Sequence, residues 1–404
     1  MRKCKILLSA LLILILVCLI VPTPGYAVGT CGPNATWNVL GTTMTISGTG
    51  PISIEDSAPW STMRSVVTEV IIEPGITAIG DKVFQNFTAL TAITLPDSVT
   101  EIGASAFSGC KQLTHIELPV GLLSLGSRAF ASSGLLSITL PENVTRLNEY
   151  LFFSCKNLKE VNLSPRTCVI GASAFSECGS LAAITIPSTL YQIDEKAFNG
   201  CRNLEEVYIE DLISWLGITF HSNPLEYHAK LYVDGVQLTD LVIPEGITKV
   251  PARAFIRCAG LKSVTIPQGV ISIGTDAFSY CPDLTEISLP NSLQRLTGFE
   301  GCSYIQTVHF DGTLQEFQKY NPGKEFVNAE LYLTIEGASQ SMKVIADEIF
   351  GPIFAWLQEN GWKIVVITLL IVLAALAITL GIITSVVDKY KRQSAKWRVK
   401  KNIK

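Results

Sequence analysis

The residues that could carry out catalysis or hold a metal are few, and their spacing does not join them into a site. The four histidines are His115, His221, His228 and His309, and no two stand at the separation of metal ligands. The sequence contains no HExxH, GxSxG or glycine-rich phosphate loop. Carboxylates are plentiful. A glycosidase needs two of them roughly 5–9.5 Å apart, and the sequence alone leaves open whether such a pair exists. Since nothing else favours an enzyme, we expect a non-enzymatic protein without metal or cofactor.

Most of the cysteines share one position in a repeating frame, three residues after a recurring phenylalanine. These are Cys110, Cys155, Cys178, Cys201, Cys258, Cys281 and Cys302. Disulfides or a metal are one interpretation, because stacked coils would bring cysteines close together. A ladder of buried thiols filling the inside of each turn is the other. We favour buried thiols, because no pair has C-x-x-C spacing and an odd number of cysteines, nine of the 11, follows residue 27. Cys31 and Cys168 lie outside the frame.

The phenylalanines themselves mark a repeat of 22 or 23 residues. They are Phe84, Phe107, Phe130, Phe152, Phe175, Phe198, Phe255, Phe278 and, two residues early, Phe299. An aliphatic residue precedes each by five positions, or by three at Phe299, and in most copies apolar residues follow at plus six, nine and eleven, often before a proline. Alternation such as that of Ile116 and Leu118 places side chains on one face of a strand. The Ala-Phe-x-x-Cys piece is interpreted as a single helical or 3-10 turn.

One such coil cannot bury its own apolar face, so nine coils are expected to stack around a continuous core. The predicted fold is a β-rich solenoid with a parallel sheet and short helical or 3-10 turns. The repeats occupy residues 66–206 and 244–307, and a cap of residues 28–65 precedes them.

A module of different pattern interrupts the array at residues 207–243, because Phe198 and Phe255 stand 57 positions apart. Asp234-Gly235 links two strand-like runs within it and predicts a β-hairpin. A similar order of residues recurs at 308–338, where it is expected to form a C-terminal cap over the open sheet edge. One module is therefore used twice.

The two ends of the chain predict export and anchoring. Residues 1–27 have the basic start, apolar run and small-residue cleavage site of a signal peptide, with an uncleaved anchor as the alternative. Residues 339–362 carry an amphipathic stripe and are predicted to form a juxtamembrane helix. Residues 363–387 are predicted to form a transmembrane helix, and the basic tail 388–404 is predicted to be cytoplasmic. We expect a single-pass protein of the cell membrane with an extracellular ectodomain.

This topology concentrates negative charge outside the cell. The chain has 31 basic and 35 acidic residues. Three basic residues precede residue 28, and nine basic residues and one acid follow Trp362, so the body between them has 19 basic and 34 acidic residues. A body near −15 disfavours nucleic acid as a partner, because nucleic acid requires a basic footprint.

The N-terminal motifs and the coils together resemble a known family. Gly29-Thr30-Cys31-Gly32, Thr45 to Gly50 and Pro59-Trp60 precede coils of the form Ile-Gly…Phe…Leu…Ile-x-Leu-Pro. Over residues 29–335 this is similar to the BspA-like (Treponema-type) bacterial leucine-rich repeat surface proteins. The resemblance implies a leucine-rich repeat fold and a role in adhesion and binding rather than catalysis, with partners that vary and do not transfer residue by residue. The predicted transmembrane helix departs from many relatives.

The outward-facing residues of the repeat strands are the candidates for binding an extracellular protein or glycan. The most distinctive are His115, Glu117, Glu160, Asn162, Glu206, Tyr208, Thr265, Glu286 and His309. For any single one of them, a plain solvated sheet face explains the residue type equally well. An adhesin is the main hypothesis; a surface spacer or coat protein, and a receptor that signals through a partner, are the alternatives. The sequence leaves the oligomeric state open.

Overall fold

The computed structural model describes residues 27–54, 58–320, 326 and 329–333. All of them belong to the first of the two units into which the chain divides, Met1–Lys343 and Val344–Lys404. The predicted signal peptide apart from Ala27, the juxtamembrane helix, the transmembrane helix and the basic tail lie outside the described residues. Within the described ranges, no helix has the length and apolar character that crossing a membrane requires.

An antiparallel sheet closes the N-terminal end of the core. Its strands are β1 (Ala27–Thr30), β2 (Asn34–Leu40) and β3 (Thr43–Ile52). β3 then joins both sheets that follow, because its first half pairs in parallel with β4 (Glu69–Ile72) and its second half with β5 (Ile76–Ile79). Trp60 precedes the 3-10 helix η1 (Ser61–Met63), is buried, and packs edge-on against Trp37 with ring centroids 5.5 Å apart.

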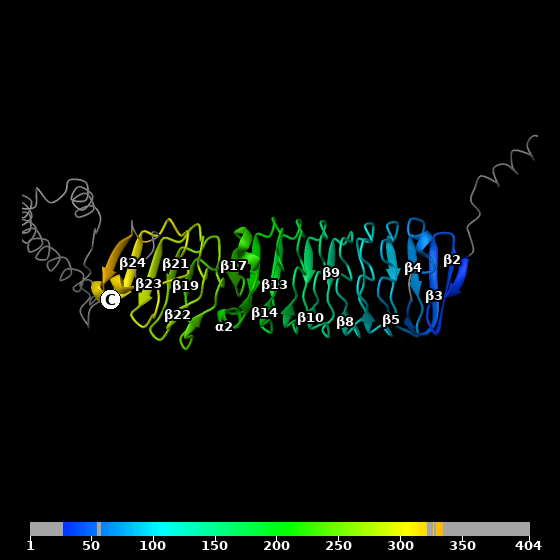
Figure 1. Ribbon diagram of the computed structural model, residues 1–404, viewed down its shortest axis with the longest axis horizontal. Coiled ribbons are helices and arrows are strands. Elements are labelled where there is room, and N and C mark those ends of the chain that lie inside the picture. Colours follow the sequence, from blue (N-terminus) through cyan, green and yellow to red (C-terminus); the bar gives the residue numbers. More distant parts are fainter. Residues whose placement is uncertain (1–26, 55–57, 321–325, 327–328, 334–404) are drawn as a thin grey trace, which may run out of the picture. The chain divides into compact units, whose positions relative to one another are not determined.

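The coils then stack along one axis, so that each contributes strands to two walls (Figure 1). The first wall consists of β4 with β6 (Ala92–Thr94), β9 (Ser137–Thr139) with β11 (Glu160–Asn162), then β13 (Ala183–Ile186), β15 (Glu206–Ile209), β17 (Lys230–Val233) and β18 (Val236–Gln237), and finally β19 (Asp240–Val242), β21 (Ser263–Thr265), β23 (Glu286–Pro290), β24 (Thr307–Asp311) and β25 (Glu330–Leu333). Within each of the sheets that make up this wall, neighbouring strands pair in parallel, except for β17 and β18, which are antiparallel. The prediction of a parallel β-solenoid is confirmed.

The second wall is built from shorter strands. They are β5, β7 (Glu101–Ile102) and β8 (Ser124–Leu125), then β10 (Arg146–Leu147), β12 (Val169–Ile170), β14 (Gln192–Ile193) and β16 (Thr219–Phe220), and then β20 (Lys249–Val250) with β22 (Ser272–Ile273). Each of these strands after β5 contains the aliphatic or aromatic residue that points into the core.

The predicted parallel sheet is interrupted at the coil of Phe107. Residues 111–119 form no strand, so His115 and Glu117 lie in an irregular segment between β6 and β9. Ile116 is nevertheless buried, and the carbonyl oxygen of Thr114 accepts a hydrogen bond from the backbone N–H of Leu136 at 3.0 Å. Burial and the bonds of the remaining walls hold this coil in the stack, so it does not require a complete strand ladder.

The third side of each coil, here called the turn wall, is not the helical or 3-10 turn that the sequence predicted. The residues two before and two after the repeat phenylalanine have positive φ, as at Ser173 (54°) and Glu177 (63°). Left-handed residues at this spacing prevent a helix from forming. Alternate backbone N–H groups point at the next coil: Ser173 donates to the carbonyl of Glu195 and Phe175 to that of Ala197. The N–H groups between them close tight turns within the coil, as from Ser176 to the carbonyl of Ser173. The turn wall is therefore a third ladder of hydrogen bonds between coils.

The core is one continuous cluster of buried apolar side chains. Its centre is the phenylalanine column, in which rings of neighbouring coils stack with centroids 5.0–5.8 Å apart and interplanar angles of 3–16°. The seven repeat cysteines lie beside this column and are fully buried, as the ladder of buried thiols predicts. Six of the thiols donate to the carbonyl oxygen of the repeat phenylalanine one coil earlier, at 3.0–3.2 Å.

The module at 207–243 has the hairpin that Asp234-Gly235 predicted. β17 and β18 are antiparallel, and Asp234 (φ 47°) and Gly235 (φ 74°) turn the chain between them. Before the hairpin lie the helix α2 (Leu212–Leu216), β16 and the 3-10 helix η2 (Pro224–Tyr227). The same order of strand, helix and strand recurs as β24, α3 (Leu314–Lys319) and β25, and in both copies a polar N-cap side chain starts the helix.

Candidate functional site

The outer face of the first wall carries the side chains that the sequence selected. Strand alternation exposes them: in β11, Glu160 and Asn162 face outward while Val161 is buried between them. His115 and Glu117 are also exposed, with Nε2 and Oε1 3.8 Å apart, although no strand positions them. Asn162 donates to Glu160 at 3.0 Å and to Thr139 at 3.3 Å. These residues form small contacts along the wall rather than one site.

Two of the predicted residues, Glu206 and Tyr208, belong to a larger cluster on β15 and β17, here called the first aromatic patch. Tyr208 lies beside Tyr232 in the parallel register, and their rings stack with centroids 4.8 Å apart. The Tyr208 hydroxyl donates to one oxygen of Glu206 at 2.6 Å, and the Tyr232 hydroxyl donates to the other at 3.4 Å. The bond to Glu206 raises the pKa of the Tyr208 hydroxyl, because the carboxylate stabilises its proton. Lys230 stands beside Glu206 in the same register.

Glu286 and His309 belong to an equivalent cluster in the C-terminal copy of the module, here called the second aromatic patch. Nε2 of His309 lies 3.1 Å from Oε1 of Glu286 on the neighbouring strand. The His309 ring stacks on Tyr332 of β25 with centroids 5.1 Å apart. The Tyr332 hydroxyl donates to Glu330 at 2.8 Å. Thr265 of β21 lies on the same face but makes no side-chain bond to either patch among the described residues.

The two patches occupy the same place in their modules. Each stacks an aromatic ring from the first strand of the module on a tyrosine from the second, beside a carboxylate that holds a ring in place. Sequence reasoning missed Tyr232, Glu330 and Tyr332. The signal was present in Ala229-Lys230-Leu231-Tyr232 and Ala329-Glu330-Leu331-Tyr332, whose repetition indicated only a duplicated module. Stacked rings held beside carboxylates offer flat apolar surface and hydrogen-bond acceptors at one place, which suits recognition of a sugar or a polar protein surface.

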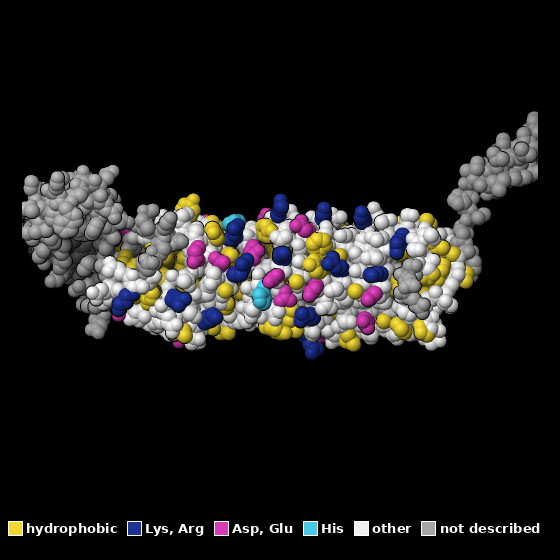
Figure 2. All heavy atoms as spheres, viewed as in Figure 1, with side chains coloured by type: hydrophobic (Ala, Val, Ile, Leu, Met, Phe, Trp, Pro, Cys, Tyr) yellow, Lys and Arg dark blue, Asp and Glu magenta, His cyan; other side chains and the backbone are white. Residues whose placement is uncertain are grey.

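Electrostatics over the surface is mixed rather than of one sign. On the face shown in Figure 2, basic and acidic side chains are interspersed among apolar and uncharged ones. Among the described residues, no three histidine, cysteine, aspartate or glutamate side chains are grouped so that they could hold a metal ion.

Comparison with known families decides what kind of protein this is. The family model described as "BspA type Leucine rich repeat region" matches residues 67–217 and 228–350, with six copies. The chain belongs to the BspA-type leucine-rich repeat family. The resemblance noted from the sequence is thereby confirmed, and the gap in the match falls within the inserted module, in the stretch that contains β16 and η2.

Solved structures of several leucine-rich repeat proteins align with most of the chain. A leucine-rich repeat protein from Bacteroides ovatus is 20% identical, and the alignment covers 78% of this chain and 99% of that one with a TM-score of 0.46. A leucine rich cell surface protein from Faecalibacterium prausnitzii is 22% identical, with 74% and 98% covered and a TM-score of 0.35. The T. pallidum leucine-rich repeat protein is 20% identical, with 65% and 89% covered and a TM-score of 0.29. Comparison with curated proteins gives no match.

Proposed function

We propose that this BspA-type protein is a membrane-anchored cell-surface binding protein that engages an extracellular protein or glycan through the outer face of its first wall. One observation carries the proposal: two stacked aromatic pairs with carboxylates recur at equivalent strand positions on that exposed face. A plain solvated face does not need rings stacked and fixed in this way twice. The predicted signal peptide and transmembrane helix support placement of this face outside the cell.

Binding rather than catalysis is supported by the form of the two patches. Stacking and hydrogen bonds to carboxylates hold the aromatic side chains of both patches, so each patch presents a fixed surface to a partner. Adhesion is the role we infer for this binding; a passive spacer in the surface coat is the competing role.

The test compares cells that display the full-length chain with cells that display variants. The paired change Tyr208→Ala with Tyr232→Ala removes the first aromatic patch, and Thr94→Ala changes an exposed residue of β6 as the matched control. Saturable binding to a panel of matrix proteins and glycans should weaken at least tenfold in the paired variant and stay unchanged in the control. Equal binding by all three chains, or no binding across the panel, would favour the spacer.

A further inference from the structure

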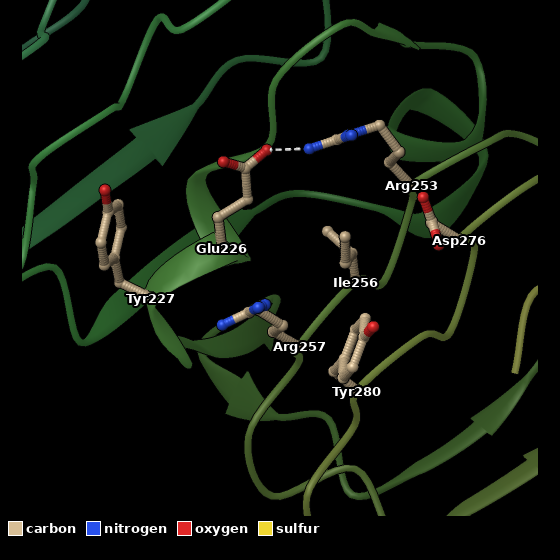
Figure 3. Close-up of a pocket in the computed structure, with 7 residues that line it drawn as sticks. All are labelled: Glu226, Tyr227, Arg253, Ile256, Arg257, Asp276 and Tyr280. Carbon is tan, nitrogen blue, oxygen red and sulfur yellow. Dashed lines mark hydrogen bonds and ion pairs between the residues drawn. The ribbon is translucent and has the colours of Figure 1, made fainter. Parts of the chain in front are cut away.

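A pocket of about 300 Å³ lies on the turn wall where the inserted module meets the resuming coils. Its lining comes from η2 of the module (Glu226, Tyr227), the coil of Phe255 (Arg253, Ile256, Arg257) and the coil of Phe278 (Asp276, Tyr280) (Figure 3). None of these residues belongs to the aromatic patches on the first wall. The pocket is therefore separate from the surface proposed above, and its role does not depend on that proposal.

One side of the pocket is a rigid, charge-neutral pair. Nη2 of Arg253 donates to Oε1 of Glu226 at 2.5 Å, and the same oxygen accepts the backbone N–H of Asn223 at 3.1 Å. Asn223 also donates from Nδ2 to the carbonyls of Arg253 and Ala254, at 2.8 and 3.2 Å. These bonds fix Glu226 and Arg253 against each other, so the pair shapes the pocket and leaves no net charge in it.

The opposite side offers a positive charge that the protein does not neutralise. The guanidinium of Arg257 lies over the Tyr280 ring, 5.1 Å from its centroid, and in Figure 3 both side chains lie across the pocket from the Glu226–Arg253 pair. Within the described chain, no carboxylate lies within ion-pair distance of Arg257. A guanidinium stacked on an aromatic ring keeps its planar edge for a carboxylate. Arg257 therefore points to a ligand with a negative group.

The remaining lining matches a small ring that carries hydroxyl groups. Tyr280 is 49% exposed, so the free edge of its ring offers apolar surface to a ligand beside Arg257, while Ile256 forms a buried apolar floor. The carboxylate of Asp276 can accept hydrogen bonds from hydroxyls. The volume lies at the low end of the roughly 300–1,000 Å³ of small-molecule sites, which suits one monosaccharide-sized group. A longer acidic peptide would bring further negative groups toward Asp276, whereas a sugar with one carboxylate brings a single negative group, which Arg257 can receive.

We propose that this pocket binds a carboxylated sugar residue, with its carboxylate on Arg257, its ring against the exposed edge of Tyr280 and a hydroxyl on Asp276. The ligand is an acidic monosaccharide unit, either free or at the end of a glycan. Affinity for it falls as salt rises, because the pocket is open to solvent and the contact with Arg257 is ionic.

The test is saturation-transfer NMR on the full-length chain in detergent, with N-acetylneuraminic acid and glucuronic acid as probes and N-acetylglucosamine, acetate and a polyglutamate peptide as comparisons. An acidic sugar should receive saturation, and Arg257→Gln should weaken its binding about tenfold, the loss expected for one charge-assisted hydrogen bond. Arg128→Gln is the matched control, because Arg128 makes the same contact with Tyr150 at 4.0 Å outside the pocket. Tyr280→Ala gives a second variant at an exposed position should Arg257→Gln fold poorly.

Binding of an acidic sugar that is lost in Arg257→Gln and Tyr280→Ala but kept in Arg128→Gln supports the proposal. The absence of saturation transfer to both acidic sugars, equal binding of N-acetylglucosamine or acetate, equal loss in the Arg128 control, or tighter binding of polyglutamate would each overturn it. The paired variant at Tyr208 and Tyr232 should bind the acidic sugar normally, so failure here and failure of the first-wall function are separate results.

Discussion

The carbonyl oxygen of a repeat phenylalanine accepts two hydrogen bonds in these coils. That of Phe152 takes the backbone N–H of Cys155 at 3.0 Å within its own turn and the Cys178 thiol from the next coil at 3.1 Å. A carbonyl has two lone pairs, and a thiol is small and apolar enough to reach the second one inside the core. In the coil of Phe84 this position holds Phe87, whose ring packs edge-on against Phe84 instead. The repeat cysteines thus fill space in the core and also donate hydrogen bonds to backbone carbonyls of the preceding coil.

The same burial predicts their reactivity. It raises the pKa of Cys110, Cys201 and Cys258 to about 12, so almost none of these thiols is ionised at pH 8. Cys168 is only half-buried. Iodoacetamide added to the native protein at pH 8 should modify Cys168 first and leave the other three intact until urea unfolds the chain, as read by peptide mass spectrometry. Modification of Cys201 as fast as Cys168 in the native protein would contradict this.

The N-cap of α2 predicts a pH-dependent stability. The Asp211 carboxylate accepts the backbone N–H and the hydroxyl of Ser214, both at 2.8 Å, and these bonds lower its pKa. A carboxyl group whose pKa is lower in the folded state stabilises that state at pH values above its pKa in the unfolded chain. This stabilisation is lost as the pH falls through the pKa of the folded state. Asp211→Ala should cost about 1 kcal/mol at pH 7.

The check is urea denaturation of the native protein and of Asp211→Ala, at pH 7 and at a pH below 3.8, which is the ordinary pKa of aspartate. The difference in unfolding free energy should shrink at the lower pH. Asp211→Asn serves as the control, because its amide oxygen still caps the helix and should preserve most of the stability at both pH values. A gap between the native chain and Asp211→Ala that is unchanged at low pH would show that the carboxylate charge is not involved.

At the scale of elements, a tryptophan supplies the first hydrogen bond of the turn wall wherever no regular coil precedes. In regular coils the N–H of each repeat phenylalanine donates to the residue before the next one, as from Phe152 to Ala174. The coil of Phe84 has no such donor before it, and Nε1 of Trp60 donates to the carbonyl of Val83 at 2.9 Å. After the module, Nε1 of Trp215 donates to the carbonyl of Ala254 at 3.0 Å. An indole N–H therefore replaces a backbone N–H at both starting points.

Removing the Trp60 indole N–H should leave the buried carbonyl of Val83 unsatisfied, whereas the carbonyl of Ala254 keeps the longer bond from Asn223 when the Trp215 indole N–H is removed. Trp60→Phe should lower the unfolding free energy by about 1–3 kcal/mol beyond the loss of ring volume. Trp215→Phe should lower it by less than Trp60→Phe, because Asn223 still donates to the carbonyl of Ala254. Trp37→Phe is a matched control, because Nε1 of Trp37 is buried and makes no hydrogen bond among the described residues. Urea denaturation of the three variants measures the difference. Equal losses in all three would mean that ring volume, not the hydrogen bond, sets the cost.

The elements that sequence reasoning could predict are those with a periodic or local signal. The spacing of the phenylalanines predicted the coils, and Asp234-Gly235 predicted the hairpin. The turn wall was mistaken for a helical turn because residues such as Glu177 and Tyr280 adopt positive φ without being glycine. The missing strand at His115 has no sequence signal, since its pattern of Ile116 and Leu118 matches that of coils with strands.

The candidate sites were predictable only in part, for a related reason. Glu206, Tyr208, Glu286 and His309 face outward by strand alternation, which sequence supplies. Their stacking partners depend on which strands the module places side by side, as β17 lies beside β15. The pocket is harder still to predict from the sequence, because its lining comes from three segments. Arg257 and Tyr280 also face it from left-handed positions of the turn wall.

At the scale of the whole described chain, the inserted module is where all three ladders between coils stop. The first wall ends at β18 and resumes at β19, and the second ends at β16 and resumes at β20. Side chains bridge the turn wall there: the N–H of Gly200 donates to the Tyr227 hydroxyl at 2.6 Å, and Trp215 and Asn223 donate to the coil of Phe255. One backbone bond, from the N–H of Ala259 to the carbonyl of Ala229 at 3.1 Å, also crosses the junction, and the core continues there without a break. Elsewhere in the described part, a break in a strand wall leaves the turn wall intact.

This arrangement predicts that the solenoid unfolds in two blocks. Stacked repeats are stabilised mainly by contacts with their neighbours, so the weakest junction separates cooperative units. The block of residues 240–333 has fewer coils than the block of residues 69–238, and it should open first. Hydrogen exchange of the native full-length chain, followed by peptide mass spectrometry, should show faster exchange in β19–β24 than in β9–β15, with the boundary at the module. Trp215→Phe should widen that difference, because it removes one of the bridging bonds, whereas Trp60→Phe acts within the first block and should narrow it. Uniform protection across the module in the native chain, unchanged by Trp215→Phe, would mean that the continuous core couples the coils more strongly than the three interrupted ladders separate them.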